Sequence, residues 1–420
     1  MLIRRSFGLT LLPIIVALAA TTLSAAAQSR ATTADLSGIV LDQSKAVLPG
    51  ATVVVTNIAT GVERTTETGG DGRFIVPALP PGSYSIRVSL QGFATQAMPR
   101  LDLALGQEAE VSFVLSIAGA AELVTVTAEA GMADVQQTAV ATVVSQQQIE
   151  ALPINGRNFM TFSILTPGVT TDRTPQQGAS ATSGLTFAGQ RARSNNITVD
   201  GLDNNDATLG SVRATFSQEA VQEFQVITNS YSAEFGKASG GVVNIVTRSG
   251  SNDLRGNAFY YFRDESLNAK EHFEKKNPAG DRIDRKKAPF SQQQFGGTLG
   301  GPIRRNQSFF FLSAERLDTQ ANNFVNIDDK TPVTVFGQNV GTAVDILRRA
   351  GFPVEVGNVP YDVESSQILA KVDTNVTANH AVAVRLNWAD LLNENIEPWG
   401  RLRGAAARTW TAATSWRRCP

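Results

Sequence analysis

The sequence predicts a mainly β protein, and three observations carry this prediction. Apolar and polar residues alternate with a period of two in many segments, as in strands with one buried face. The chain has 35 glycines, and its charged fraction of 18% lies below the ~25% of an average soluble domain, which favours a turn-rich fold. After residue 27 no apolar run approaches 18 residues, so entry into a membrane would require strands closed into a barrel. At 420 residues the chain is long enough for about two to four domains.

Composition excludes several functions. With 37 basic and 38 acidic residues the net charge is -1, so there is no basic field to attract phosphate backbones, and nucleic acid is not an expected partner. Two histidines and one cysteine remove most metal sites built from imidazole or thiolate ligands. We therefore expect no cofactor, no zinc chemistry and no intrachain disulfide.

The first 27 residues have the pattern of an export signal. Arg4 and Arg5 precede an apolar run at 9–20, and the alanines that end at Ala27 form a small-residue cleavage site before Gln28. The run is too short to span a bilayer, which needs ~20 residues. The two arginines also loosely fit a twin-arginine signal, but the strongly apolar stretch favours the general export route.

Residues 31–117 predict a small β-sandwich. Leu101, Leu103 and Leu105 alternate with Asp102 and Ala104, as in a strand with one buried face. Turn signals with proline and glycine recur about every ten residues, which predicts about seven short strands; the signals are Pro49-Gly50, Gly69-Gly70-Asp71-Gly72 and Pro80-Pro81-Gly82.

Two stretches of this region, SGIVLDQSKAVLPGATVVV and GGDGRFIVPALPPGSYSIRVSLQGF, resemble the carboxypeptidase-regulatory-like domain. The resemblance implies a prealbumin-like or starch-binding-like β-sandwich. Peptidase activity is not expected, because His272 is followed by Glu274 and not by a glutamate at position 275. Carbohydrate binding needs exposed aromatic rings, whereas at least three of the four aromatic residues here occupy apolar-face positions and are expected in the core; the four are Phe74, Tyr84, Phe93 and Phe113.

Residues 118–131 form a predicted linker with an acidic and then β-branched segment. Such a chain can lie extended and add a strand to the sheet edge of a partner. The segment resembles the TonB box, which implies the energy-coupling protein TonB as partner; its residues are Glu122, Leu123, Val124, Thr125, Val126, Thr127 and Ala128. The alternative interpretation is a linker strand that packs on its own domain.

Residues 132–250 contain a short helical pattern over 143–152, a strand ending in Asp-Gly, a short helix, a strand around 224–228, and a strand over 242–247 after a glycine-rich turn. The sequence segments VDG and YSAEFGKASGGVVNIVTRSG resemble the plug domain of TonB-dependent receptors, in particular that of the Oar-like subgroup. The predicted plug turns are Asp200, Gly201, Gly236, Gly240 and Gly241.

Three acidic residues near the first of these turns allow a second interpretation. Asp200, Asp203 and Asp206 could ligate calcium through oxygen, but their spacing does not match the two-residue ligand step of an EF-hand loop. Asx turns, in which the carboxylate accepts from nearby backbone, are the favoured interpretation.

Residues 251–399 predict the first strands of an outer-membrane barrel. Ten of the 26 Phe and Tyr residues fall between 259 and 311, which is typical of aromatic girdles at a lipid boundary. The stretch 290–318 resembles the first barrel hairpin of the Oar-like family, and a second hairpin is predicted around 377–379. We expect about five strands, a loop-rich insertion over 322–362 and a helix at 342–350.

Five strands cannot close, since single-chain barrels have at least eight. Residues 400–420 abandon the alternating pattern, which suggests an atypical, frame-shifted tail, so we expect an incomplete barrel from a truncated chain.

The resemblance as a whole implies an Oar-like TonB-dependent receptor of the outer membrane, without enzymatic activity. Energised uptake of an unidentified substrate would follow displacement of the plug. The implied partners are TonB, a carbohydrate or peptide ligand, and outer-membrane lipid. The alternative is an exported carbohydrate-binding or adhesion protein that acts through its N-terminal sandwich.

Overall fold

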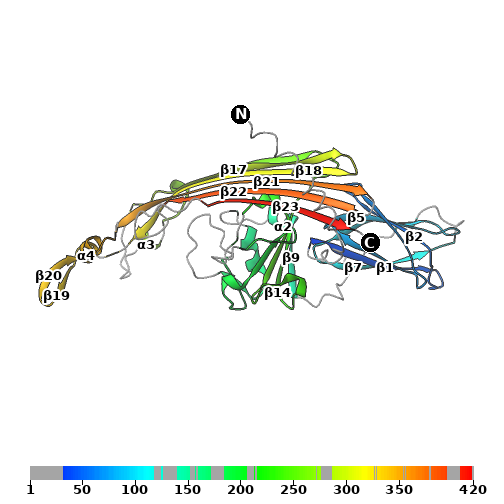
Figure 1. Cartoon of the computed structure of the whole chain (residues 1–420), viewed down its shortest axis with the longest axis horizontal. Coiled ribbons are helices and arrows are strands. Elements are labelled where there is room, and N and C mark those ends of the chain that lie inside the picture. Colours follow the sequence, from blue (N-terminus) through cyan, green and yellow to red (C-terminus); the bar gives the residue numbers. More distant parts are fainter. Residues whose placement is uncertain are drawn as a thin grey trace, which may run out of the picture.

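The computed structural model shows three regions along the chain (Figure 1). A β-sandwich lies at one end, a long six-stranded sheet runs along the molecule, and a small α+β unit lies beneath one face of that sheet. The structure describes residues 32–117, 124–125, 140–151, 157, 159–171, 184–205, 212, 215–270, 272–275, 286–325, 327, 329–352, 354, 356–377, 380–394 and 407–418. The prediction of a mainly β fold is confirmed.

The sandwich consists of two sheets, ordered β4-β1-β7 and β3-β2-β5-β6-β8. Its strands are β1 (Ala34–Asp42), β2 (Thr52–Asn57), β3 (Glu63–Glu67), β4 (Arg73–Leu79), β5 (Gly82–Ser89), β6 (Gln96–Leu103), β7 (Glu108–Leu115) and β8 (Val124–Thr125). Buried and exposed positions alternate along β7 and over much of β4 and β6, because successive side chains point to opposite faces.

The inner faces of the two sheets enclose a core of apolar side chains. Phe74, Tyr84 and Phe113 are at most 2% exposed, and Phe93 packs partly buried against the same cluster. The aromatic residues of the sandwich are therefore core residues, as the sequence predicts. The Tyr84 hydroxyl donates to the Pro80 carbonyl at 2.6 Å, so its polar end is satisfied.

The α+β unit has a central sheet ordered β13-β12-β15-β14-β9. Its elements are β9 (Val140–Ser145), α2 (Gln146–Ala151), η3 (Phe159–Leu165), β10 (Val169–Thr171), β11 (Leu185–Phe187), η4 (Ala192–Ser194), β12 (Asn196–Val199), β13 (Leu202–Asp203), η5 (Gln218–Ala220), β14 (Val221–Asn229), η6 (Ala233–Phe235) and β15 (Val242–Thr247). The prediction of helix from residue 143 was wrong for 143–145, which extend β9. There β9 pairs with β14, and β-branched Val143 and Val144 suit a strand.

The long sheet is antiparallel throughout, in the order β16-β17-β18-β21-β22-β23. The elements of this region are β16 (Arg255–Asp264), η7 (Glu265–Leu267), α3 (His272–Lys275), β17 (Ser291–Arg304), β18 (Ser308–Val325), β19 (Pro332–Val335), β20 (Gln338–Thr342), α4 (Ala343–Arg349), β21 (Gly357–Thr377), β22 (His380–Glu394) and β23 (Ala407–Arg418).

Two expectations for this region need correction. Strands β18 and β21 extend to Val325 and back to Gly357, so the insertion between them is shorter than the predicted loop over 322–362. The tail does not abandon the sheet, because β23 pairs with β22 from His380–Arg418 to Leu391–Ala407. Threonine and tryptophan, which favour strands, recur along β23 and extend the sheet to six strands.

The two faces of the long sheet differ in polarity. The face toward the α+β unit carries buried polar side chains, including Ser313, Lys371 and Arg385. The opposite face carries exposed apolar ones, including Leu312, Val372 and Val384. This inverted pattern, apolar outside and polar inside, is that of a membrane barrel wall. Within the described residues, no helix is both long and apolar enough to cross a membrane.

Candidate functional site

The predicted turn at Val199-Asp200-Gly201 lies at the end of β12. Asp200 has φ 49° and Gly201 has φ 80°, so both adopt the left-handed conformation. The Asp200 amide donates to the Ile245 carbonyl of β15 at 2.8 Å. The turn therefore fixes the Asp200 side chain at the edge of the sheet.

The glycines of the second turn differ in their steric role. A Cβ on Gly240 would lie 2.3 Å from Asn195 Oδ1, and one on Gly241 would lie 2.1 Å from the Phe187 ring, so both positions require glycine. A Cβ on Gly236 would meet nothing within 4 Å. Gly236 thus lies in the turn, but the space around it would also admit a residue with a side chain.

Asp200 is the centre of a buried polar cluster that joins the α+β unit to the long sheet. Its carboxylate pairs with Arg385 of β22 at 2.6 Å and accepts from the amide and hydroxyl of Thr247 at 2.8 and 2.7 Å. Burial alone would raise the pKa of Asp200, but the charges of Lys371 and Arg385 and the hydrogen bonds from Thr247 outweigh it and lower the pKa. The carboxylate is therefore ionised and held by the barrel wall.

Lys371 of β21 completes this cluster from the neighbouring strand. Its Nζ donates to the Thr247 carbonyl and hydroxyl at 3.2 and 3.3 Å. Lys371 and Arg385 face each other across the β21–β22 pair, so two cations on adjacent strands meet one carboxylate of the α+β unit. A nearby contact from the same wall joins Gln367 to the Thr215 hydroxyl at 3.0 Å.

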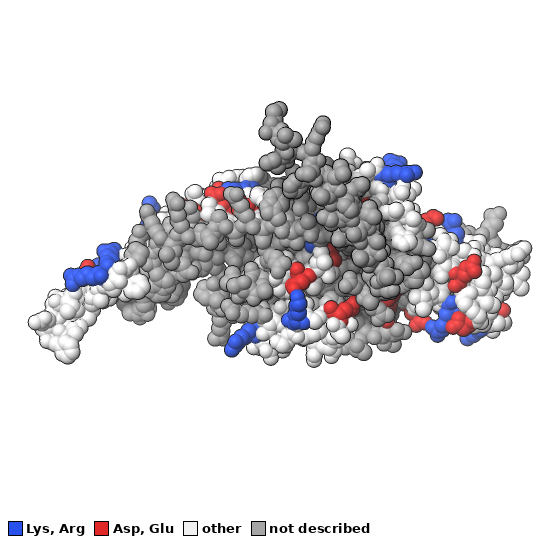
Figure 2. Space-filling view, in the orientation of Figure 1, with Lys and Arg blue, Asp and Glu red and all other residues white. Residues whose placement is uncertain are grey.

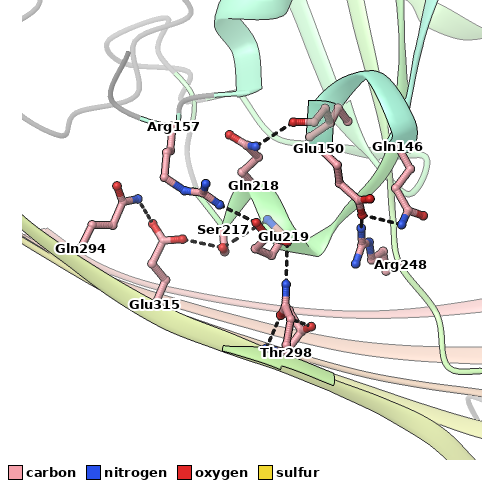
Figure 3. Close-up of polar contacts among 12 residues, drawn as sticks. Gln146, Glu150, Arg157, Ser217, Gln218, Glu219, Arg248, Gln294, Thr298 and Glu315 are labelled. Carbon is pink, nitrogen blue, oxygen red and sulfur yellow. Dashed lines mark hydrogen bonds and ion pairs between the residues drawn. The ribbon is translucent and has the colours of Figure 1, made fainter. Parts of the chain in front are cut away.

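A second polar cluster surrounds the 3-10 helix η5 (Figure 3). Ser217 caps this helix by accepting from the Glu219 amide, and its hydroxyl donates to Glu315 of β18 at 2.5 Å. Glu315 also accepts from Gln294 of β17 at 2.7 Å. The contact between helix and barrel wall is again made by polar groups.

Arg157 and Glu219 form the charged part of this second cluster. They pair at 2.5 Å, and both side chains are less than 15% exposed. Glu219 also accepts from Asn257 of β16 at 2.9 Å, and the Arg157 guanidinium lies 4.3 Å from the centre of the Tyr261 ring, close enough for a cation–π contact. Arg248 pairs with Glu150, which accepts from Gln146, within the α+β unit (Figure 3).

Among the described residues, two apolar side chains of the long sheet also take part in the contact. Phe311 and Leu369 of the long sheet join the core cluster of the α+β unit. The remaining inward positions described above are polar, so the interface holds the unit by directional bonds that can be exchanged for water. Across the described residues, no group of three or more His, Cys, Asp or Glu is placed to hold a metal ion.

Asp203 makes the local contacts expected of an Asx turn. Its carboxylate accepts from the Asn205 amide at 2.9 Å and pairs with Lys237 at 2.6 Å, and these contacts lower its pKa despite partial burial, which acts in the opposite direction. Asp206 lies outside the described residues.

Sequence reasoning missed the residues that meet Asp200. Lys371 and Arg385 interrupt alternating strands at inward positions, where a soluble sheet would place apolar side chains. A charged residue at such a position is the available signal, but its partner lies 185 residues away and leaves no local pattern.

Part of the predicted coupling segment lies within the sandwich. Val124 and Thr125 form β8, which pairs in parallel with Gln96 and Ala97 of β6. This is the arrangement of the alternative interpretation, a linker strand on its own domain. Glu122, Leu123, Val126, Thr127 and Ala128 lie outside the described residues, as do the predicted cleavage residues Ala27 and Gln28.

On the face that Figure 2 shows, acidic and basic side chains are interspersed over the sandwich end of the molecule. With a net charge of -1, no single sign dominates the chain.

Three known protein families match the chain in succession. The carboxypeptidase regulatory-like domain matches residues 35–116, the TonB-dependent receptor plug domain matches 134–243, and an outer-membrane β-barrel domain matches 246–334. These matches place the chain among TonB-dependent receptors of the outer membrane.

A characterised relative agrees with this class. The chain is 27% identical over 365 residues to the TonB-dependent transporter Oar of Myxococcus xanthus. The aligned region covers 83% of this chain and 33% of Oar. The chain thus spans about a third of the length of that relative. Transporters and receptors of this kind are not enzymes.

Solved structures of outer-membrane receptors are also similar. The siderophore receptor PirA from Acinetobacter baumannii aligns with a TM-score of 0.39 and 19% identity, over 61% of this chain and 32% of PirA. The outer-membrane transporter YddB from Escherichia coli aligns with a TM-score of 0.43 and 14% identity, over 61% of this chain and 33% of YddB.

Proposed function

We propose that the chain supplies the plug and the first barrel strands of a receptor for energised uptake of a ligand through the outer membrane, with the α+β unit as the plug that opens the path. The observation that carries this proposal is the polar contact between plug and barrel wall, centred on Asp200 and Arg385. Polar groups can exchange their partners for water, so a pulled plug can leave such a wall without exposing a large apolar face. No catalytic step is part of this function.

The lengths of the strand connections support an orientation for this transport. Outer-membrane barrels have short periplasmic turns and longer extracellular loops. Strand β17 ends at Arg304 and β18 begins at Ser308, whereas β18 and β21 are joined through β19, β20 and α4. The sandwich contacts the short β17–β18 turn through Asn306, and we therefore propose that the sandwich lies on the periplasmic side.

The segment Glu122–Ala128 is proposed to bind TonB by strand addition. Val124 and Thr125 already have an extended backbone that pairs with a sheet edge, and this is the conformation that β-augmentation needs. Proline at such a position removes the amide donor and restricts the preceding residue.

A binding experiment tests this coupling. A peptide of residues 118–135 should bind the periplasmic domain of TonB in a calorimetric titration, and Val124→Pro or Val126→Pro should weaken binding about fivefold or more, because one lost main-chain bond costs roughly 1 kcal/mol. Val124→Thr keeps the amide and the β-branch and should bind as the parent does. Absence of binding by the parent peptide would favour the interpretation as a linker strand.

The ligand is proposed to be a carbohydrate or a peptide that enters from the extracellular side. Recognition of carbohydrate by the sandwich alone is not favoured, because Phe74, Tyr84 and Phe113 are buried in its core. A glycan array probed with the sandwich tests this alternative, and a specific signal there would favour the adhesion function.

Export is proposed to remove residues 1–27. The mature protein should begin at Gln28, since the alanines before it form the cleavage site. Mass spectrometry of the N-terminal peptide from outer-membrane preparations measures this directly, and a peptide that begins at Met1 would contradict it.

A further inference from the structure

The sandwich contacts a polar face of the plug. Along β14, Phe224 and Val226 point into the plug core, so Glu223 and Gln225 point to the opposite side of the sheet. Both are nevertheless buried, with 7% and 4% exposure. The sandwich contributes to this burial through the turn between β6 and β7.

Two residues of that turn make the contact. The Leu105 amide donates to the Glu223 carboxylate, and a Cβ on Gly106 would lie 2.9 Å from Gln225 Nε2. Leu105 is 1% exposed yet belongs to none of the apolar core clusters of the described residues. Its backbone contact with Glu223 places this buried residue where the sandwich meets the plug.

A second contact holds the same domain against the end of the barrel sheet. The Asn252 amide donates to the Ala59 carbonyl at 2.9 Å, and the Asn252 side chain donates to the Thr60 carbonyl at 2.7 Å. Asn252 also bonds to Asn306 in the β17–β18 turn, and a Cβ on Gly61 would lie 2.3 Å from Asn306 Oδ1. The turn between β2 and β3 thus fits closely against two asparagines at the barrel rim.

We propose that the sandwich is a clamp that docks on both plug strand β14 and the barrel rim, and that release of this clamp precedes displacement of the plug. The sandwich contacts the plug through its β6–β7 turn and the barrel rim through its β2–β3 turn, and plug and barrel are the two parts that must separate during transport. Both contacts are made by backbone and amide groups or by a single carboxylate, which suits an interface that opens and closes. The sandwich keeps its own apolar core when it leaves, so release does not require it to unfold.

The coupling segment lies on the same sheet as the clamp. Strand β8 pairs with the start of β6, and the end of β6 leads within two residues to Leu105. A pull that removes β8 from this sheet edge therefore acts on the strand that carries the plug contact. This release step rests on the proposed coupling to TonB, whereas the docking itself does not.

Thiol labelling can measure the docked state. Gln225→Cys in a Cys419→Ser background gives a chain whose one cysteine lies beneath the sandwich, since Cys419 is the only native one. In the parent, a bulky maleimide should react slowly with this buried position. Leu105→Glu puts a carboxyl at a position that is 1% exposed, next to the contact, and should raise the labelling rate on the order of tenfold or more by opening the dock.

Matched variants separate undocking from damage to the sandwich. Val114→Glu adds the same charge to the same domain at a position 47% exposed and should leave labelling unchanged. Gly61→Val disrupts the contact with the barrel rim and should also raise the labelling rate. Gly92 has a comparable left-handed backbone, φ 87° against 66° for Gly61, but a Cβ there would meet nothing within 4 Å. Gly92→Val should therefore leave the labelling rate unchanged.

The final arm tests release in cells. Labelling of Gln225→Cys with a membrane-permeant maleimide should be faster in energised cells with TonB than in cells without it. Equal rates would overturn release by TonB, and slow labelling in both Leu105→Glu and Gly61→Val would overturn the clamp. Failure of the peptide titration with TonB would instead count against the proposed coupling and leave the labelling difference between variants intact.

Discussion

The interior of the sandwich and the contact between plug and barrel differ in the kind of interaction that stabilises them. The sandwich encloses apolar side chains such as Leu36, Val53 and Phe113, each fully buried. The plug meets the barrel wall through polar groups such as Asp200, Glu219 and their partners, beside the apolar Phe311 and Leu369. Apolar burial is non-directional and is lost only by exposing the whole surface to water, whereas each polar contact can be replaced by water. The comparison suggests that the sandwich remains folded while the plug contact opens.

The largest effect is expected where a buried charge loses its partner. Arg385→Leu leaves Asp200 inside the barrel wall with Lys371 as the remaining cation, and should cost about 3 to 5 kcal/mol in the free energy of plug opening. The rate of tryptic cleavage in the plug, measured in detergent, reports this opening. Arg255→Leu removes an exposed pair with Asp253 and serves as the control.

A double variant sharpens this result. Asp200→Asn combined with Arg385→Leu removes both charges, so it should be less destabilised than Arg385→Leu alone. If the two variants are equally destabilised, the loss arises from packing and the polar description of this contact is wrong.

The next effect tests the apolar side of the comparison. Isolated residues 31–117 should fold and melt cooperatively, since β1 to β7 of the sandwich pair with one another within this span. Leu103→Ala removes a side chain that is 3% exposed and should cost about 2 to 5 kcal/mol in the free energy of unfolding. Val114→Ala on the outer face should change it by roughly 0.5 kcal/mol or less. A broad melt of the parent domain would contradict an independent core.

The sequence predicted individual strands and turns better than the contacts between distant elements. The strand at 242–247 follows from a local rule, because its β-branched residues favour strands. A glycine-rich turn at 240–241 was also predictable, but the side chains that leave no room for a Cβ there, Asn195 and Phe187, belong to distant parts of the chain. The ion pair of Asp200 with Arg385 could not be predicted in the same way, since it depends on how two distant strands meet. Strand β23 was missed because its backbone pairs with β22 although its composition departs from the preceding strands.

The pH response should distinguish the sandwich–plug contact from the plug–barrel contact. Burial raises the pKa of Glu223 from its ordinary 4.5 to about 7, although the Leu105 amide acts in the opposite direction. A raised carboxyl pKa means that the docked state binds the proton more tightly, so its stabilisation is complete below pH 4.5 and is lost as pH rises through about 7. Asp200 has a lowered pKa, so its contribution is present above its ordinary value of 3.8 and is lost only in acid.

The pH range between these two pKa values separates the contribution of Glu223 from that of Asp200. Between pH 5 and pH 8 the docked chain should lose roughly 1 to 3 kcal/mol of stability from this group, given ~1.4 kcal/mol per unit of pKa shift. Thermal melts of the chain in detergent at the two pH values measure the loss. Glu223→Gln retains an acceptor for the Leu105 amide without the titration, so its melt should depend less on pH. An equal dependence in both proteins would show that other groups cause it.

The smallest effect is expected at an ion pair that belongs to neither contact. Arg73 and Glu110 pair at 3.3 Å on the outer face of the sandwich, and their side chains are 58% and 53% exposed. Water and salt screen such a pair, so Glu110→Ala should change the free energy of unfolding of the isolated sandwich by about 0.2 to 1 kcal/mol, and less at high salt. The same measurement on Leu103→Ala supplies the scale. A loss at Glu110 as large as that at Leu103 would mean that charge also stabilises the sandwich, and would remove the contrast between its apolar interior and the polar contact of plug with barrel.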